Sequence, residues 1–173
     1  MIKGKKRVDP KWFAIKAIWL SIVMLVVFKW AFGSFANHYS FLYDAQPIRC
    51  IPEYKAYFLK KNQPITKGAI YAFRAKGLMP FFPDGARLGK YVIAVGGDHV
   101  EINENGVFVN GELKTTGFVL ANKLGKKPES FYKTFAMPEG KAFFVGTAPR
   151  SYDSRYWGLV DFNQIIGKAI PIW

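Results

Sequence analysis

An apolar stretch near the N-terminus constrains this chain more than any other feature. It runs from residue 12 to residue 32 and is interrupted only by Lys16, Ser21 and Lys29. As an α-helix with a rise of about 1.5 Å per residue, it would span about 30 Å, which matches the hydrocarbon core of a bilayer. Both lysines lie near the ends, where long side chains reach the interface. The sequence therefore predicts one transmembrane helix over residues 12–33.

The charges around this stretch predict its orientation. Five basic residues precede its apolar core: Lys3, Lys5, Lys6, Arg7 and Lys11. Positive charge accumulates on the cytoplasmic side of membranes, so residues 1–11 are expected to form a basic N-terminus in the cytoplasm. Residues 34–173 would then form one exported domain. The alternative is a cleavable signal peptide with Ser34 and Ala36 before the cut, but Lys29 and the length of the stretch favour a retained anchor.

Beyond the apolar stretch the pattern predicts a mainly β domain. Short runs rich in β-branched or aromatic residues are bounded by Gly, Asn, Pro or Lys, and they lie at 69–73, 91–95, 100–102, 107–109, 142–145 and 165–166. Asn105-Gly106 and Asn110-Gly111 predict tight turns on either side of the fourth run, since both residue types tolerate positive φ. We expect a meander of hairpins, with residues 113–135 as an inserted excursion.

Cys50 and Lys90 are the candidates for covalent chemistry. Cys50 is the only cysteine of the 173 residues, which excludes an intramolecular disulfide. Lys90 leads an apolar run that ends in Gly97-Asp98. Burial disfavours the ammonium form of a lysine, so a lysine in a dry strand can act as a general base for a nearby nucleophile. The alternative for Cys50 is a buried structural thiol, which is the commoner fate of a free cysteine.

Three segments resemble the bacterial type I signal peptidase family, most closely its conjugative-transfer branch, the TraF-type pilin peptidases. The resemblance covers most of residues 47–160. The segments are Cys50-Ile51-Pro52, where the family has Ser-x-Pro; Lys90 to Gly97-Asp98; and a late box from Gly146 to Gly158. The resemblance implies a twisted, partly open β-barrel assembly and a Cys50/Lys90 dyad in place of the family's Ser/Lys dyad. A thiol is more acidic than an alcohol and its thiolate is more nucleophilic, so the exchange is chemically tolerable.

The late box supplies the supporting residues that the resemblance implies. Ser151 is expected beside Lys90, where a hydroxyl can hold the amine in position. Asp153 and Arg155 are expected as an ion pair beneath the site, and two residues apart on a strand they would point to the same side. The alternative for this pair is an ordinary surface ion pair. For the oxyanion, the backbone N–H of Cys50 is a natural donor, whereas Ile48 replaces the hydroxyl residue that the family often has two positions upstream.

Composition restricts the partners. The formal net charge is +13, but no zinc-finger spacing, helix-turn-helix pattern or RNA-binding aromatic box accompanies it, so we expect no nucleic-acid partner. The basic residues gather around the N-terminal stretch and in loops such as 123–127, where anionic lipid head groups are the expected partner. Two histidines, His38 and His99, and one cysteine leave little for a metal, so we expect neither metal nor cofactor.

The sequence thus predicts a single-pass enzyme of the bacterial inner membrane whose periplasmic domain cleaves an exported precursor, for which the resemblance implies a conjugative prepilin and other conjugation-system proteins as partners. A thioester on Cys50 would react well with amines, so the product could be a ring. Two alternatives are an inactive family member that serves as a scaffold and an anchored β-domain that binds peptides. The apolar loop 77–83 is expected either to dip into the membrane or to fold onto the core.

Overall fold

The computed structural model describes residues 9–173, which divide into two units, residues 9–38 and Tyr39–Trp173. The first unit is the helix α1, Pro10–His38. This helix is long and apolar enough to cross a membrane, and none of its side chains is buried within the protein. The stretch predicted to span the membrane, 12–33, therefore lies entirely within a helix. Most of the predicted cytoplasmic N-terminus, residues 1–8, lies outside the described residues.

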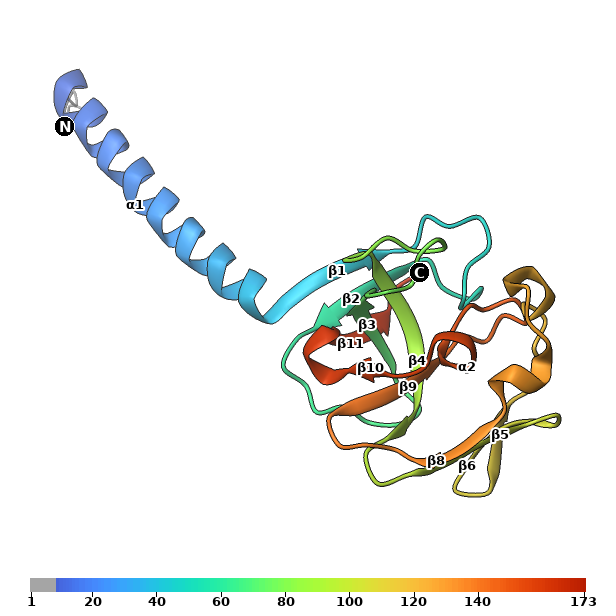
Figure 1. The fold of residues 1–173 in the computed structure, drawn as a ribbon. Coiled ribbons are helices and arrows are strands. Elements are labelled where there is room, and N and C mark those ends of the chain that lie inside the picture. The colour runs from blue at the N-terminus through green and yellow to red at the C-terminus, as the bar shows by residue number, and fades with distance from the viewer. Residues whose placement is uncertain (1–8) are drawn as a thin grey trace. The chain divides into compact units, whose positions relative to one another are not determined.

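The second unit is mainly β, which confirms the predicted fold class (Figure 1). Its strands are β1 Tyr39–Tyr43, β2 Ala56–Lys60, β3 Ile70–Arg74, β4 Arg87–Val95, β5 His99–Asn103, β6 Gly106–Val109, β7 Glu112–Thr115, β8 Lys133–Ala136, β9 Lys141–Val145, β10 Val160–Asp161 and β11 Ile165–Pro171. The helical elements are the four-residue α2, Ser154–Trp157, and three short 3₁₀ turns, Asn122–Leu124, Pro128–Phe131 and Phe162–Gln164.

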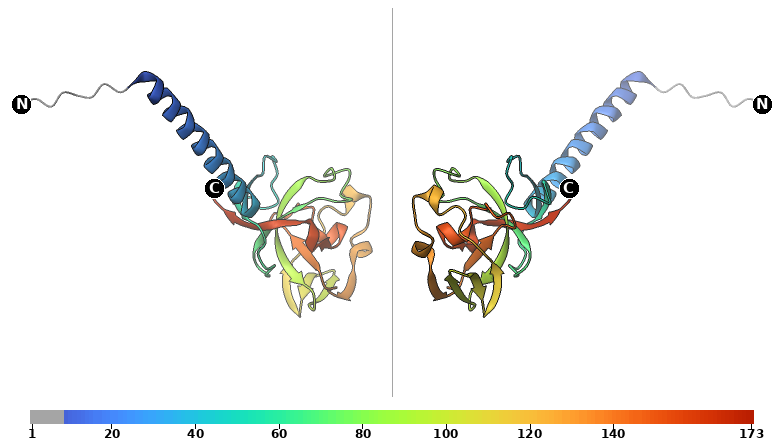
Figure 2. Two further views of the ribbon diagram at one scale, coloured as in Figure 1. Left: turned by 90° about the vertical axis from the view of Figure 1, so that its left-hand side faces the viewer. Right: turned by 90° about the vertical axis from the view of Figure 1, so that its right-hand side faces the viewer.

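The strands form two antiparallel sheets. The larger has the order β1-β2-β11-β3-β4-β9-β10 and the smaller the order β7-β6-β5-β8. In Figures 1 and 2 the larger sheet curls, and the smaller sheet lies at one end of the unit. Among the described residues β1 and β10 do not pair, so the larger sheet stays open along its edges.

Strand β4 connects the two sheets. Its first half pairs with β3 and its second half with β9, with a register shift between Val92 and Ala94. On one side of this shift Val92 packs in an apolar cluster with Phe73 and Phe144, whereas Ala94 joins a second cluster with residues of the smaller sheet. Alternate residues of β4, namely Leu88, Lys90, Val92 and Ala94, are buried, so the side chain of Lys90 is held inside the domain.

Each of the six predicted runs overlaps a strand, and the meander of hairpins is present in β4 to β7. At the second predicted turn, Asn110 and Gly111 both have positive φ, at 52° and 83°, as a tight two-residue hairpin requires. The predicted runs did not include β1, β2, β7, β8 or β10. The excursion 113–135 contains the end of β7, two 3₁₀ turns and the start of β8, which fits its weak strand signal.

Candidate active site

Lys90 is the most deeply buried cation of the candidate site. It lies in β4 opposite Tyr71 of β3, and its side chain is fully buried. Its Nζ donates a hydrogen bond to Oγ of Ser151, 3.0 Å away, and the Ser151 side chain is buried as well. The expected contact between these two residues is therefore present. A buried amine needs such a partner, because an unpaired polar group inside a protein costs free energy.

Cys50 lies in the loop between β1 and β2 and is partly buried. Its carbonyl oxygen accepts a hydrogen bond from the backbone N–H of Ala148, 3.1 Å away. Next to this contact, the hydroxyl of Thr147 donates to the carboxylate of Glu53, 3.1 Å away. These bonds join the Cys50 loop to the loop after β9, although about a hundred residues separate them. Within residues 9–173 the backbone N–H of Cys50 donates to no protein acceptor.

Gly146 lies where the Cys50 loop, Ser151 and Lys90 come together. A Cβ atom at this position would lie 2.5 Å from the carbonyl oxygen of Cys50 and closer still to Oγ of Ser151. The backbone of residue 50 and the hydroxyl that binds Lys90 therefore pack against the same glycine. Real Cβ atoms do not approach so closely, so only glycine allows this junction. The structure thus places the Cys50 loop, Ser151 and Lys90 around one point.

Asp153 and Arg155 form a buried ion pair. Nε of Arg155 donates to Oδ1 of Asp153 at 2.8 Å and Nη2 donates to Oδ2 at 2.9 Å, which is the bidentate geometry favoured by a guanidinium and a carboxylate. The side chains of Arg155 and Asp153 are only 1% and 0% exposed, respectively. The alternative of an ordinary surface pair is therefore wrong.

The prediction that this pair lies on a strand is also wrong. Asp153 caps the N-terminus of α2, where its Oδ1 accepts from the backbone N–H of Arg155 at 3.3 Å. A residue before a helix and one in its first turn lie close enough to pair, so helical geometry produces the contact that strand alternation was expected to produce. The pair still supports the junction, because Oδ2 of Asp153 accepts from the backbone N–H of Gly146 at 3.2 Å.

Arg155 also binds the inserted excursion, residues 113–135. Its Nη1 donates to the carbonyl oxygens of Thr116 and Gly117 at 2.8 and 2.9 Å. Burial alone would lower the pKa of Arg155, but the hydrogen bonds and charge of Asp153 outweigh it and raise that pKa. The guanidinium therefore stays charged while buried, and it ties residues 116–117 to the loop that contacts Cys50.

Asp98, in the Gly-Asp pair after the lysine strand, lies apart from this junction. Its Oδ1 accepts from Nζ of Lys67 at 2.6 Å and from Nδ2 of Asn110 at 2.7 Å, and its Oδ2 accepts from the backbone N–H of Val95 at 2.9 Å. Burial opposes ionisation of this carboxyl, but these hydrogen bonds hold its pKa below its ordinary value. Asp98 therefore fixes the turn between the two sheets.

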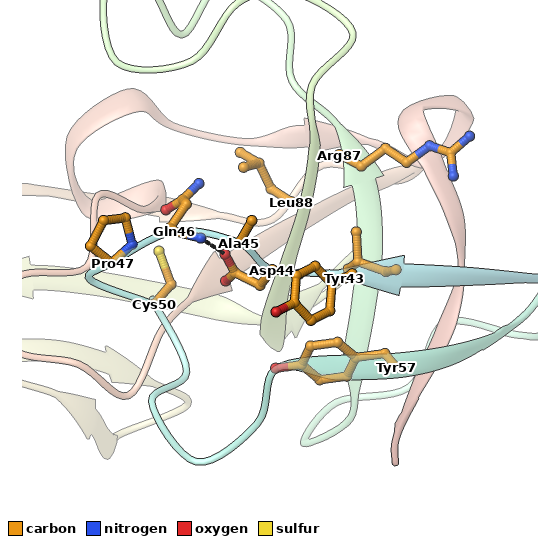
Figure 3. A pocket seen from close by; sticks show the side chains of 11 residues that line it. Tyr43, Asp44, Ala45, Gln46, Pro47, Cys50, Tyr57, Arg87 and Leu88 are labelled. Atoms are coloured by element: carbon orange, nitrogen blue, oxygen red, sulfur yellow. Dashed lines mark hydrogen bonds between the residues drawn. The ribbon is translucent and has the colours of Figure 1, made fainter. Parts of the chain in front are cut away.

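Two cavities meet at Cys50. The first, which we call the strand cavity, has a volume of about 360 Å³ and is lined by residues 42–47, Cys50, Tyr57 and residues 87–89. Figure 3 shows Cys50 beside Pro47 at one end of this cavity and Arg87 at the other. Burial, reinforced by the carboxylate of Asp44, raises the pKa of Tyr57, so its phenol remains a neutral donor.

The second cavity, which we call the aromatic cavity, has a volume of about 440 Å³ and shares only Gln46, Pro47 and Cys50 with the first. Its remaining lining residues come from other parts of the chain: Ile48, Phe81, Phe82, Leu120, Lys123, Arg150 and Tyr152. The sequence marked Ile48, loop 77–83, loop 123–127 and the late box separately, but no sequence signal placed them around one cavity, because only folding brings these segments together.

The aromatic cavity also shows how loop 77–83 packs. Leu78 in this loop is buried, and the rings of Phe81 and Phe82 pack on Tyr152 at centroid distances of 4.6 and 6.3 Å. Met79 is the exception, with an exposed fraction of 66%. The loop folds onto the domain, as the second alternative predicted, and it forms one wall of the aromatic cavity.

In the part of the chain that the structure describes, no cluster of three or more His, Cys, Asp or Glu side chains is placed to hold a metal ion. His99 lies in β5, where its backbone N–H donates to Oδ1 of Asn110 at 2.8 Å.

The chain is similar in sequence to known proteins. Residues 12–173 match the family described as signal peptidase, peptidase S26. The probable signal peptidase I-2 of Synechocystis sp. is 30% identical over 86 residues, which cover 49% of this chain and 37% of that protein. The plasmid transfer protein TraF of Escherichia coli is 29% identical over 132 residues, which cover 66% of this chain and 75% of that protein. A solved signal peptidase I from Enterococcus faecalis is 27% identical, covering 61% of this chain and 97% of that chain with a TM-score of 0.39.

Proposed function

Because this chain belongs to the peptidase S26 family of signal peptidases, we propose that it is a membrane-anchored endopeptidase that cleaves exported precursors with a Cys50/Lys90 dyad. The observation that carries the proposal is the buried hydrogen bond from Lys90 to Ser151, whose hydroxyl packs on the same glycine as the backbone of Cys50. A buried lysine with one hydroxyl partner has no evident structural purpose. As a general base beside a nucleophile it has a chemical one.

The proposed reaction proceeds in two steps. Lys90 takes the thiol proton of Cys50, and the sulfur attacks the carbonyl carbon of the scissile bond. The C–N bond then breaks, the leaving nitrogen takes the proton from Lys90, and a thioester remains on Cys50. In the second step water attacks the thioester, Lys90 carries the proton of water to the sulfur, and the acid product leaves. The free N–H of Cys50 is available to donate to the oxyanion in both steps.

The unpaired edge of β4 is an argument for a peptide substrate. Residues 87–90 pair with β3 on one edge, whereas β9 pairs only with residues from Tyr91 onward. Among the described residues the second edge of 87–90 has no strand partner, and the strand cavity lies along residues 87–89. An extended peptide can add to such an edge through backbone hydrogen bonds, which would lead it from Arg87 toward Cys50.

The membrane placement belongs to the same proposal. Helix α1 would anchor the chain in the inner membrane, with residues 1–11 in the cytoplasm and residues 34–173 in the periplasm, because the positive charge lies ahead of the helix. An enzyme held there would lie beside the membrane-embedded leader of a precursor. The similarity to a plasmid transfer protein supports a conjugative prepilin as the precursor and conjugation proteins as partners.

The test is a comparison of exported proteins in cells that carry the wild-type chain or a variant. Mass spectrometry of protein N-termini would report every precursor that this chain cleaves. Cys50→Ala and Lys90→Met should both leave a precursor uncut, Cys50→Ser should retain part of the activity, and Lys76→Met, which changes an exposed lysine, should match the wild type. Normal processing with Cys50→Ala would reject the dyad and favour a scaffold or a peptide-binding domain.

A further inference from the structure

The aromatic cavity has a fixed apolar interior. Phe81 and Phe82 are held against Tyr152, and the cluster continues to Tyr156, whose ring stacks on that of Tyr152 at a centroid distance of 6.0 Å. The hydroxyl of Tyr156 accepts a hydrogen bond from the backbone N–H of Leu120, 3.2 Å away. Leu120 is itself buried, so both walls of the cavity are anchored to the domain. A preformed apolar cavity of this kind takes an apolar side chain.

Positive charge surrounds this interior. Lys123 and Arg150 line the cavity, both side chains are exposed, and Nζ of Lys123 lies 5.2 Å from the ring centroid of Phe81. None of the described lining residues carries a carboxylate. A ligand that places an acidic group near this rim would therefore meet two cations and no opposing charge.

The position of Cys50 indicates which ligand fits. Cys50 lines both cavities, so a peptide whose scissile carbonyl lies at its sulfur has one cavity on each side. The strand cavity follows the free edge of β4, where the acyl part of the substrate can lie extended. The part of the substrate that leaves with the amine can then occupy the aromatic cavity.

We propose that the aromatic cavity binds the precursor segment on the leaving-group side of the scissile bond and selects an apolar residue accompanied by an acidic one. This inference rests on the proposed function. Phe81, Phe82 and Tyr152 contact the apolar side chain, and Lys123 and Arg150 pair with the acidic one.

Cleavage of two synthetic peptides by the full chain in detergent tests the selection. Both peptides carry Ala-Gln-Ala before the cut, and they continue with either Glu-Phe-Glu or Lys-Phe-Lys. The wild type should cleave the acidic peptide with a kcat/KM roughly fivefold higher, since exposed ion pairs are individually weak. The double variant Lys123→Glu/Arg150→Glu should reverse this preference. Lys127→Glu, which changes a charge in the same loop outside the cavity, should keep it.

A second measurement does not depend on proteolysis. Cys50 is the only cysteine, so the rate of its alkylation by iodoacetamide reports directly on occupancy beside its sulfur. The peptide Glu-Phe-Glu-Ala should slow the reaction of the wild type, and it should have no effect on Lys123→Glu/Arg150→Glu. Cleavage without acidic preference, or equal protection by the acidic and basic peptides, would overturn this inference alone. Protection without cleavage would support it while counting against the proposed function.

Discussion

Lys90 donates a hydrogen bond to Ser151 across 3.0 Å although 61 residues separate them in the chain. The bond joins the middle of β4 to the segment before α2, and both side chains are buried. It fixes the direction of the buried amine. If Lys90 accepts a proton from the thiol of Cys50, as proposed, this constraint favours the reaction, because proton transfer depends on geometry.

Ser151→Ala should therefore lower kcat by about 10- to 100-fold with little change in KM, because it removes the group that positions the amine. Leaving the buried amine without an acceptor should also lower the free energy of unfolding by about 1–3 kcal/mol. Ser154→Ala is the matched control. Its hydroxyl is equally buried and accepts from the backbone N–H of Phe144 at 2.9 Å, so it should lose similar stability but keep its kcat. Equal losses of kcat in both variants would reduce Ser151 to a structural residue.

Gly146→Ala should disrupt the junction between the Cys50 loop and Ser151. The new methyl group would overlap the carbonyl oxygen of Cys50, which is backbone and cannot move without its loop. We expect a loss of at least about 1–3 kcal/mol of stability, as for other overpacked sites, together with loss of cleavage. Gly96→Ala is the control, since its methyl group would meet only the end of the flexible Glu139 side chain. Thermal unfolding and peptide cleavage measure both effects, and an active Gly146→Ala protein would contradict the proposed geometry.

The buried ion pair between Asp153 and Arg155 should be more sensitive to substitution than an exposed ion pair. Asp153→Asn leaves the Arg155 guanidinium buried without its counter-charge, which should cost about 3–5 kcal/mol in urea unfolding. Arg155→Lys keeps the charge but loses the bidentate contact and the hydrogen bonds to residues 116–117, so it should also be destabilised. The ion pair between Lys141 and Asp161 is the control: it is partly exposed, and Asp161→Asn should cost at most about 1 kcal/mol. Comparable losses for the two pairs would contradict the role assigned to burial.

The lowered pKa of Asp98 predicts that its ionised carboxylate stabilises the fold and that this stabilisation is lost in acid. Its pKa lies below the ordinary value of 3.8, so the folded state binds its proton less readily than the unfolded state. The stabilisation is complete above pH 3.8 and is lost as the pH falls through the lowered pKa of the folded state. The unfolding free energy of the wild type should therefore fall more steeply below that pH than that of Asp98→Asn. Glu104→Gln, which changes an exposed carboxylate, should follow the wild type. Parallel curves for the wild type and Asp98→Asn would contradict this prediction.

The proposed thioester on Cys50 predicts the fate of the product. Thioesters react with amines especially well relative to water, and an amine held nearby reacts at a high effective concentration. If the N-terminus of the substrate resolves the acyl-enzyme, the mature product is a ring that is lighter than its linear form by one water. Intact mass of the mature substrate distinguishes the two forms. A product that is wholly linear, with the same distribution from Cys50→Ser, would indicate simple hydrolysis.

Local patterns in the sequence were sufficient to predict the helix, several strands and the candidate site residues of this protein. The apolar stretch predicted a helix because its length and composition are sufficient, without reference to any other part of the chain. The run after Lys90 and the Asn110-Gly111 turn predicted strands and a hairpin for the same reason. Cys50, Lys90 and Ser151 were identified through motifs, each a short run of neighbouring residues.

The tertiary structure decided what depends on segments far apart. It paired Asp153 with Arg155 through a helix cap rather than a strand, because the chain turns before α2 and alternation no longer applies. It folded loop 77–83 onto Tyr152, which supplied an apolar partner that hydropathy alone cannot locate. It also placed Gly146 against the backbone of Cys50 and formed both cavities from separated residues. Such contacts are set by the packing of the whole domain, since each depends on where the other segments come to lie.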